Sequence, residues 1–307
     1  MENKSYDVIV LGGGPAGLTS AIYLARGKMK VLVLNVGTVG GQMVLTHEIA
    51  NYPGIESIPG FQLSRNMKAQ AESFGAEIRS NVKITAMDLA AEKKLITVND
   101  KDCYSAKAVI LAPGGRSRTL NVPGEDTFKG RGISYCATCD GDFFQDKKVV
   151  VVGGGNSALE EAVALTKYAR ELTIIHQFDH FQAFEQAVAE VKKNPKISII
   201  LESEITEFIG DQKLEKIKYE NQRTHEIDEM DVDGVFILIG YVPNTEPFKG
   251  LIAVNERNEI ISDELMQTDL SGVFAAGDAR VKRYRQITTA VSDGTIAALS
   301  AMEFLNN

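Results

Sequence analysis

The sequence predicts an α/β protein, because one pattern of strand, glycine turn, helix and strand occurs in it twice. The first copy runs from the strand Tyr6–Leu11 through glycines and the apolar-periodic stretch Pro15–Arg26 to the strand Lys30–Leu34. The second copy covers residues 149–175, with strands at its ends and a helix at Ser157–Ala169. Two such units predict two Rossmann-like dinucleotide-binding domains, the second inserted into the first.

The segments around the second copy fit an insertion. Residues Glu77–Asp102 alternate in the manner of meander strands, and the chain closes with an expected helix at Thr288–Phe304. This order predicts a first domain in two pieces, 1–113 and 245–307, with residues 114–244 between them.

Composition excludes several function classes. The 307 residues are 44% hydrophobic and carry a net charge of −8, which argues against nucleic acid as a partner. The apolar runs are of strand length, so no membrane span is expected, and the first residues lack an export signal. We therefore expect a cytoplasmic protein. One local group of basic residues is either a docking surface for an acidic partner or a solvated loop with a ligand-facing arginine: Arg280, Lys282, Arg283 and Arg285.

The first glycine turn has the spacing of a dinucleotide fingerprint. Gly12 permits a tight turn, Gly14 lets the backbone approach a pyrophosphate, and Gly17 allows close packing of helix on strand. Asn35 follows the second strand, where an acidic residue usually holds the ribose, and its amide can also bond to hydroxyls. The residues expected to bind the dinucleotide here are Gly12, Gly14, Pro15, Ala16, Gly17 and Asn35.

Cys136 and Cys139 form the most specific motif of the chain, Cys-Ala-Thr-Cys-Asp. Two cysteines at this spacing on a first helical turn can close and reopen a disulfide, and helix amides stabilise their thiolates. Half of a zinc site is an alternative, but there is neither a second pair nor a histidine at ligand spacing. A structural disulfide is disfavoured in the cytoplasm. Cys103 stands alone in a polar stretch.

Further motifs resemble the low-molecular-weight thioredoxin reductase family of two-domain flavoproteins, and the resemblance covers almost the whole chain. They are Gly40-Gly41-Gln42, Asn51-Tyr52-Pro53-Gly54, Phe274-Ala-Ala-Gly-Asp278 and Arg285-Gln286. The stretch Ala290–Gly294 departs from the family's pattern at Ser292, which affects fine packing near the flavin.

The resemblance implies FAD as cofactor, thioredoxin as partner and a homodimer. It assigns 1–113 plus 245–307 to FAD and 114–244, with the redox motif, to a pyridine-nucleotide type of domain. Cys139 would lie next to the flavin, Cys136 would attack the partner, and Asp140 would be the acid/base group, with a helix-capping carboxylate as the alternative. To the flavin-binding residues named above it adds Gly41, Gln42, Asn51, Gly277, Asp278, Arg285 and Gln286, with Asp278 on the ribityl chain.

The electron donor is less clearly indicated. The fingerprint Gly153-x-Gly155-x-x-Ala158 is intact, but the family's His-Arg-Arg-x-x-x-Arg segment reads His-Gln-Phe-Asp-His-Phe-Gln over 176–182. Loss of two charge-assisted hydrogen bonds to a 2′-phosphate weakens NADPH binding by about a hundredfold or more. No Asp or Glu ends the strand for NADH. This pattern resembles the ferredoxin-dependent flavin thioredoxin reductases.

The sequence therefore predicts an FAD-dependent disulfide reductase that reduces thioredoxin, with ferredoxin as donor. The same reaction driven by NADPH or NADH through an atypical site is the alternative. A flavin reductase of the ferredoxin–NADP type would not need paired cysteines, and a flavin-bound redox sensor would show no turnover with thioredoxin.

Overall fold

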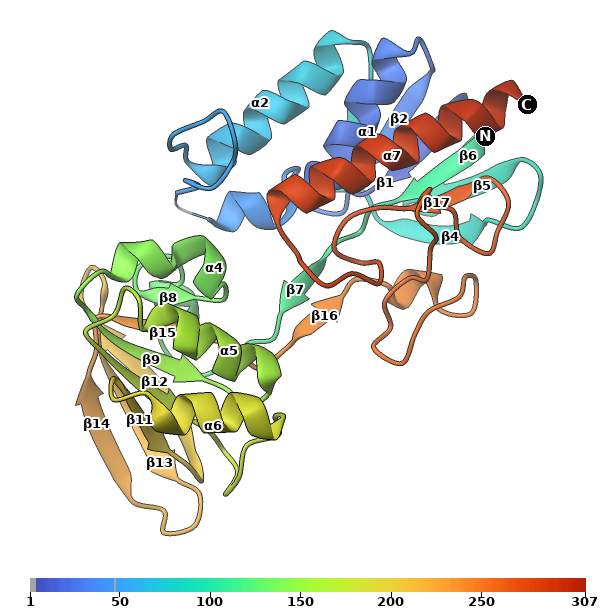
Figure 1. Ribbon diagram of the computed structural model, residues 1–307. Helices are drawn as coiled ribbons and strands as arrows, with labels where there is room; N and C mark the ends of the chain where they lie inside the picture. The colour runs from blue at the N-terminus through green and yellow to red at the C-terminus, as the bar shows by residue number, and fades with distance from the viewer. Residues whose placement is uncertain (1–3, 47) are drawn as a thin grey trace. The chain divides into compact units, whose positions relative to one another are not determined.

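The chain folds into two compact units, seen in a computed structural model that describes residues 4–46 and 48–307 (Figure 1). Unit 1 comprises the chain up to Arg116 together with Val242–Asn307, and unit 2 comprises Ser117–Tyr241. Two short strands, β7 (Gly115–Ser117) and β16 (Tyr241–Pro243), pair with each other where the chain leaves and re-enters unit 1.

Unit 1 contains a mixed sheet in the order β3-β2-β1-β6-β5-β4, with β17 beside β6. Its strands are β1 (Lys4–Leu11), β2 (Val31–Leu34), β3 (Glu77–Arg79), β4 (Ile84–Asp88), β5 (Lys94–Val98), β6 (Asp102–Leu111) and β17 (Val273–Ala275). The pairs β1–β2, β1–β6, β2–β3 and β6–β17 are parallel, and β4–β5–β6 are antiparallel.

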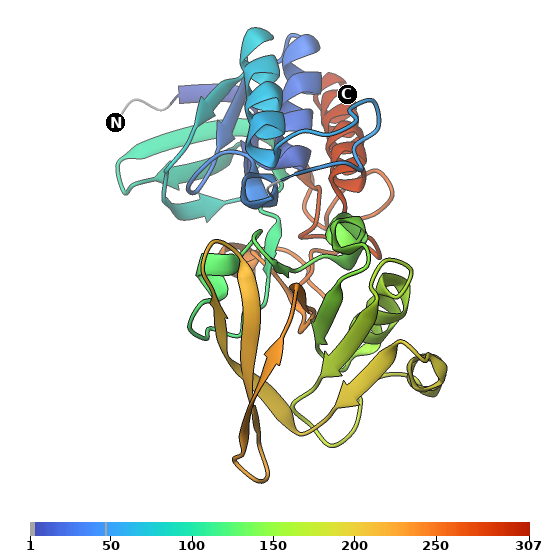
Figure 2. The same ribbon diagram turned by 90° about the vertical axis from the view of Figure 1, so that its left-hand side faces the viewer.

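The alternation of side chains along β1 divides the core of unit 1 into two faces. Val8 and Val10 pack into the cluster beneath the helices α1 (Pro15–Arg26) and α7 (Ile287–Asn306). Ile9 and Leu11 pack on the other face with Phe248, Ile252 and Ile260 from the second piece of the unit. The helix α2 (Gly60–Ser73) lies beside α1, as Figures 1 and 2 show. Because both faces of β1 are buried, its run of β-branched residues is continuous.

Unit 2 has a parallel sheet in the order β11-β10-β9-β15-β8 and an antiparallel ribbon, β12-β13-β14, drawn in gold in Figure 2. The parallel strands are β8 (Ile133–Ser134), β9 (Lys148–Val152), β10 (Glu171–Ile175), β11 (Ile197–Ile200) and β15 (Gly234–Ile237). The ribbon comprises β12 (Ser203–Gly210), β13 (Leu214–Asn221) and β14 (Ile227–Asp231). The helices are α3 (Glu125–Phe128), α4 (Ala137–Asp140), α5 (Asn156–Leu165) and α6 (Glu185–Lys193).

The predicted α/β class is therefore confirmed, with two details corrected. The segment expected to begin a meander starts with β3, which pairs in parallel with β2 and so extends the dinucleotide-type sheet. The second fingerprint helix, α5, ends at Leu165, because the following residues turn back toward β10. Within the described residues, no helix is long and apolar enough to cross a membrane.

Candidate active site

The first glycine turn of unit 1 adopts the geometry that its spacing predicts. Gly12 has φ of +115°, and a Cβ there would lie 2.1 Å from the Ala112 carbonyl oxygen, so no other residue fits. A Cβ on Gly17 would lie 1.9 Å from the Gly12 carbonyl oxygen. Gly14 is the N-cap of α1, with Pro15 in the first turn, and a Cβ there would come no closer than 3.8 Å to Gly41 Cα. Of these three glycines, only Gly14 therefore has free space beside its Cα, and it lies at the N-terminus of α1.

Asn35, which follows β2, holds this turn. Its Oδ1 accepts the Gly13 N–H at 2.8 Å, its Nδ2 donates to the Gly37 carbonyl, and the residue is 7% exposed. The Asn35 side chain, which was expected to bind a ribose, therefore stabilises the glycine turn through hydrogen bonds. A carbonyl oxygen has a second lone pair, which leaves acceptor capacity for a ligand hydroxyl.

The structure brings three separate segments of unit 1 to this turn. A Cβ on Gly41 would lie 3.2 Å from Gly14 Cα, and a Cβ on Gly277, where φ is +80°, would lie 2.9 Å from Ala16 Cβ. A Cβ on Gly294, in α7, would lie 2.2 Å from the Ala16 carbonyl oxygen. Close backbone approach at these positions therefore explains why each is glycine.

Asp278 is a half-buried carboxylate of this site. Its Oδ1 is buried and has no hydrogen-bond partner among the described residues. Burial raises the pKa of Asp278 to about 6, although Lys282 and Arg285 oppose that rise. A buried acceptor without a partner is costly unless a ligand donates to it, so Asp278 fits a hydroxyl-bearing cofactor.

Asp293, on α7, positions the turn before Asp278 and is a residue whose role the sequence analysis missed. Its Oδ2 accepts the Gly277 N–H at 3.0 Å and the Lys282 ammonium at 2.7 Å, and its Oδ1 lies 3.5 Å from the Arg280 guanidinium. Its only sequence signal was a place in the Ala290–Gly294 stretch. The buried charge is thus paired on two sides.

These ion pairs disfavour one of the two interpretations of the basic cluster, a docking surface for an acidic partner. Arg280 and Lys282 face Asp293 with side chains 14% and 8% exposed, and Arg285 pairs with the buried Glu259. Only Arg283 of the four is exposed. Three of the four cations are therefore paired with carboxylates of unit 1 and contribute little free positive charge to its surface.

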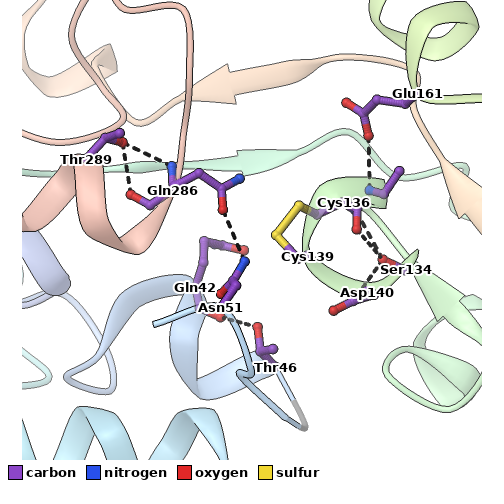
Figure 3. The surroundings of a disulfide bond; sticks show 11 residues. Gln42, Thr46, Asn51, Ser134, Cys136, Cys139, Asp140, Glu161, Gln286 and Thr289 are labelled. Carbon is purple, nitrogen blue, oxygen red and sulfur yellow. Dashed lines mark hydrogen bonds between the residues drawn. A yellow bond between two sulfur atoms is a disulfide. The ribbon is translucent and has the colours of Figure 1, made fainter. Parts of the chain in front are cut away.

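The remaining predicted flavin residues lie on the surface of unit 1. Gln42 is exposed on the 3-10 turn Gly41–Leu45. The Asn51 amide donates to Gln286 Oε1 at 3.4 Å, which joins two predicted residues 235 positions apart (Figure 3). Asn51 also lines a hollow of about 540 Å³ over residues 50–56.

In unit 2, Cys136 and Cys139 form a disulfide, with Cα atoms 5.3 Å apart. Cys136 is the N-cap of α4, and both cysteines are half-buried. No metal-binding group of His, Cys, Asp or Glu occurs among the residues that the structure describes. The pair is thus a disulfide at the start of a short helix, and Cys103 is a free thiol in β6.

Asp140 ends α4, directly after Cys139. Its Oδ2 accepts the Ser134 hydroxyl at 2.6 Å, and the same hydroxyl oxygen accepts the Cys136 N–H at 3.1 Å (Figure 3). Burial raises the pKa of Asp140, although the Ser134 hydrogen bond opposes the rise. Asp140 makes no side-chain capping bond to the following 3-10 turn. This arrangement suits proton transfer better than helix capping.

Glu161 is a second carboxylate at the motif, and the sequence analysis missed it. Its Oε2 accepts the Ala137 N–H at 3.0 Å, so α5 holds the first turn of α4 (Figure 3). The Ala137 N–H is one of the helix amides expected to stabilise a thiolate, but it already donates to the Glu161 carboxylate. Glu161 lies on the first turns of a fingerprint helix, and no local pattern distinguishes it from the neighbouring Glu160.

The second glycine turn lies in unit 2 and packs against His176. Gly153 has φ of +141°, and nothing lies within 4 Å of a Cβ placed on Gly155. His176 packs onto Gly154, where a Cβ would lie 2.4 Å from His176 Nε2. Phe181 stacks on the imidazole at 5.8 Å and Phe178 meets it edge-on at 5.3 Å. Burial lowers the pKa of His176 and so favours the neutral imidazole.

Two dinucleotide-type units and a helical Cys-x-x-Cys disulfide define a flavin-type disulfide oxidoreductase. The chain belongs to the pyridine nucleotide-disulphide oxidoreductase family, whose model matches residues 6–294. The predicted enzyme class and FAD cofactor are confirmed.

Relatives cover nearly the whole chain. A protein of Peptoclostridium acidaminophilum named thioredoxin reductase is 45% identical over 312 residues, 99% of this chain and 98% of its own. The structure of thioredoxin reductase from Streptococcus pyogenes is 38% identical, with a TM-score of 0.95 and 99% of each chain covered. A ferredoxin-flavin thioredoxin reductase from Clostridium acetobutylicum is 32% identical, with a TM-score of 0.53 and 99% of each chain covered. These names establish no ferredoxin-dependent branch for this chain.

Proposed function

We propose that this protein is an FAD-dependent thioredoxin-disulfide reductase that receives electrons from reduced ferredoxin. The observation that carries the proposal is the Cys136–Cys139 disulfide at the N-terminus of α4, followed directly by the half-buried Asp140. Relatives named thioredoxin reductase support thioredoxin as the partner. The cytoplasm as location and a homodimer remain predictions.

The residues of unit 1 fit FAD. The open N-terminus of α1 at Gly14 suits a pyrophosphate, and the buried Asp278 Oδ1 suits a ribityl hydroxyl donor. Asn35 and Gly41 border the same turn. When bound, the flavin supplies chemistry that accepts electrons singly or in pairs and delivers two to a disulfide. We therefore assign 1–113 and 245–307 to FAD binding, and 114–244 to the redox motif.

The cysteines complete the reaction by thiol–disulfide exchange. Two electrons and two protons convert the Cys136–Cys139 disulfide into two thiols. The Cys136 thiolate attacks one sulfur of the thioredoxin disulfide, and the other thioredoxin sulfur leaves as a thiolate and takes up a proton. Cys139 then attacks Cys136, which restores the internal disulfide and releases the second thioredoxin thiol. Asp140, with its raised pKa, holds and transfers the proton that Cys139 exchanges.

The donor is inferred from unit 2. Residues 176–182 contain neither Lys nor Arg, and the neutral His176 is enclosed by Phe178 and Phe181. A 2′-phosphate therefore finds no cation in this segment, which disfavours NADPH. A ferredoxin-flavin thioredoxin reductase is among the similar structures, but more similar relatives are named thioredoxin reductase, so the proposed donor rests on residues 176–182.

Anaerobic titration of the FAD-loaded protein tests donor and acceptor together. NADPH, NADH and reduced ferredoxin are added in turn while flavin absorbance and thioredoxin thiols are measured. Ferredoxin should bleach the flavin and drive thioredoxin reduction, whereas NADPH at micromolar concentration should do neither. Cys136→Ser and Cys139→Ser should each abolish turnover, with Cys103→Ser as the matched control that retains it.

The outcomes separate the two parts of the proposal. Rapid bleaching by NADPH with full turnover would replace the donor and leave the reductase intact. Flavin bleaching by any donor without thioredoxin reduction would refute the reductase and favour a flavin redox sensor. Turnover in either cysteine variant would contradict the exchange mechanism.

A further inference from the structure

The amide that follows Cys136 is held by a carboxylate from another helix. Ala137 N–H donates to Glu161 Oε2 at 3.0 Å, and the two residues are 24 positions apart in sequence. Ala137 is buried and Glu161 is half-buried, so this bond is partly shielded from water. Because Ala137 follows Cys136 directly, the Glu161 carboxylate contacts the backbone next to the cysteine proposed to attack thioredoxin.

The segments that form α4 and pack on it carry acidic groups and no basic ones, and one lysine of unit 2, Lys129, lies over the Tyr135 ring, 4.8 Å from its centroid. Neither Ser134–Phe144 nor α5, which packs on α4, contains Lys, Arg or His. The ring of Tyr168, from the turn after α5, lies beside Gly141. The ionisable groups of these segments, apart from the cysteines, are Tyr135, Asp140, Asp142, Glu160, Glu161 and Tyr168. A thiolate formed here meets like charges without a compensating cation in these segments.

We propose that Glu161 is a positioning residue that anchors the first turn of the redox motif and lowers the fraction of reduced Cys136 that is present as the thiolate. The inference rests on the proposed function, in which Cys136 is the thiol that meets the partner. It extends that function, because it assigns control of thiol reactivity to a residue of α5 outside the motif.

The physical argument has two parts. A thiolate at a helix start is stabilised by free backbone N–H groups, and Glu161 occupies the one nearest to Cys136 in sequence. The carboxylate also repels a second negative charge. Burial raises the pKa of Glu161, and the hydrogen bond from Ala137 N–H opposes that rise by stabilising the carboxylate. The thiol form resists unwanted oxidation, since the thiolate is the reactive species.

The test measures Cys136 acidity directly. In the FAD-loaded, reduced protein carrying Cys103→Ser and Cys139→Ser, the rate of Cys136 alkylation by iodoacetamide is followed between about pH 5 and 10. Glu161→Gln removes the charge and keeps an acceptor for Ala137 N–H. We expect the alkylation midpoint to move down by about half a pH unit or more. Glu160→Gln, at an exposed neighbouring position with the same change of charge, should leave the midpoint nearly unchanged.

A second variant separates charge from anchoring. Glu161→Leu removes the acceptor as well, so it should lower thioredoxin turnover, whereas Glu161→Gln should preserve most of it. An unchanged or raised midpoint in Glu161→Gln would overturn the inference. Alkylation requires neither ferredoxin nor thioredoxin, so failed thioredoxin reduction by the wild type would refute the proposed function while the midpoint comparison still decides the role of Glu161.

Discussion

The two glycine turns of this protein share a backbone frame and differ in what surrounds it. Gly12 and Gly153 both have positive φ, and their N–H groups donate to Leu34 and Ile175, the last residues of the adjacent strands. In unit 1 the next residue, Asn35, hydrogen-bonds to the turn, whereas in unit 2 the equivalent His176 packs its ring against it.

A different polar side chain lies beside each turn. Beside the first turn, Asp278 presents a buried acceptor oxygen that has no partner among the described residues. Beside the second, His176 Nε2 is also buried without a partner among the described residues, and the rings of Phe178 and Phe181 pack on the imidazole. The glycine frame alone is therefore not a binding site, because affinity comes from the side chains placed around it.

The largest effect should come from Gly14→Ala in unit 1. Gly14 has φ of −80°, which alanine adopts readily, and the nearest atom to its Cβ is 3.8 Å away, so the apoprotein should fold normally. The methyl group would face the pyrophosphate at the start of α1, and FAD affinity should fall by about a hundredfold or more. Fluorescence titration of the apoprotein with FAD measures this. Unchanged affinity together with normal folding would place the cofactor elsewhere.

A smaller effect should appear in the pH dependence of apoprotein stability. Because burial raises the pKa of Asp278 to about 6, the folded state binds more protons than the unfolded chain between about pH 4 and 6. Stability should therefore fall as pH rises through this interval, by at most about 3 kcal/mol, and Asp278→Asn should lose that dependence. Urea unfolding at several pH values measures it.

His176→Asn in unit 2 is the matched comparison for that experiment. Burial lowers the pKa of His176, so its contribution is present above the unfolded pKa and is lost as pH falls. The two substitutions should change the pH dependence in opposite directions. If both substitutions changed the pH dependence of stability in the same direction, burial would not shift the two pKa values in opposite directions as proposed.

The smallest effect is expected for Gly155→Ala in unit 2. Its φ of −87° permits alanine and nothing lies within 4 Å of the added methyl group, so stability should change by less than about 0.5 kcal/mol. If ferredoxin is the donor, ferredoxin-driven turnover should also be unchanged, because no pyrophosphate approaches this turn. A large loss of turnover, like the expected loss of FAD in Gly14→Ala, would show that unit 2 binds a dinucleotide.

Local patterns determined much of this protein from sequence alone. Helix α1 lies at the predicted Pro15–Arg26, and the strands of both fingerprints lie within two residues of their predicted bounds, because alternation and glycine spacing are local properties. The Cys136–Cys139 motif was equally plain, since its chemistry needs only two thiols at one spacing.

Only the tertiary structure decided which charges are free and which are paired. Arg280 and Lys282 form a basic patch in sequence and an internal ion pair with Asp293 in the fold. Glu161 reaches Ala137 across 24 positions, and no periodicity encodes that contact. The reason is physical: backbone conformation depends on neighbours in the chain, whereas the state of a charge depends on neighbours in space, which packing of separate elements brings together.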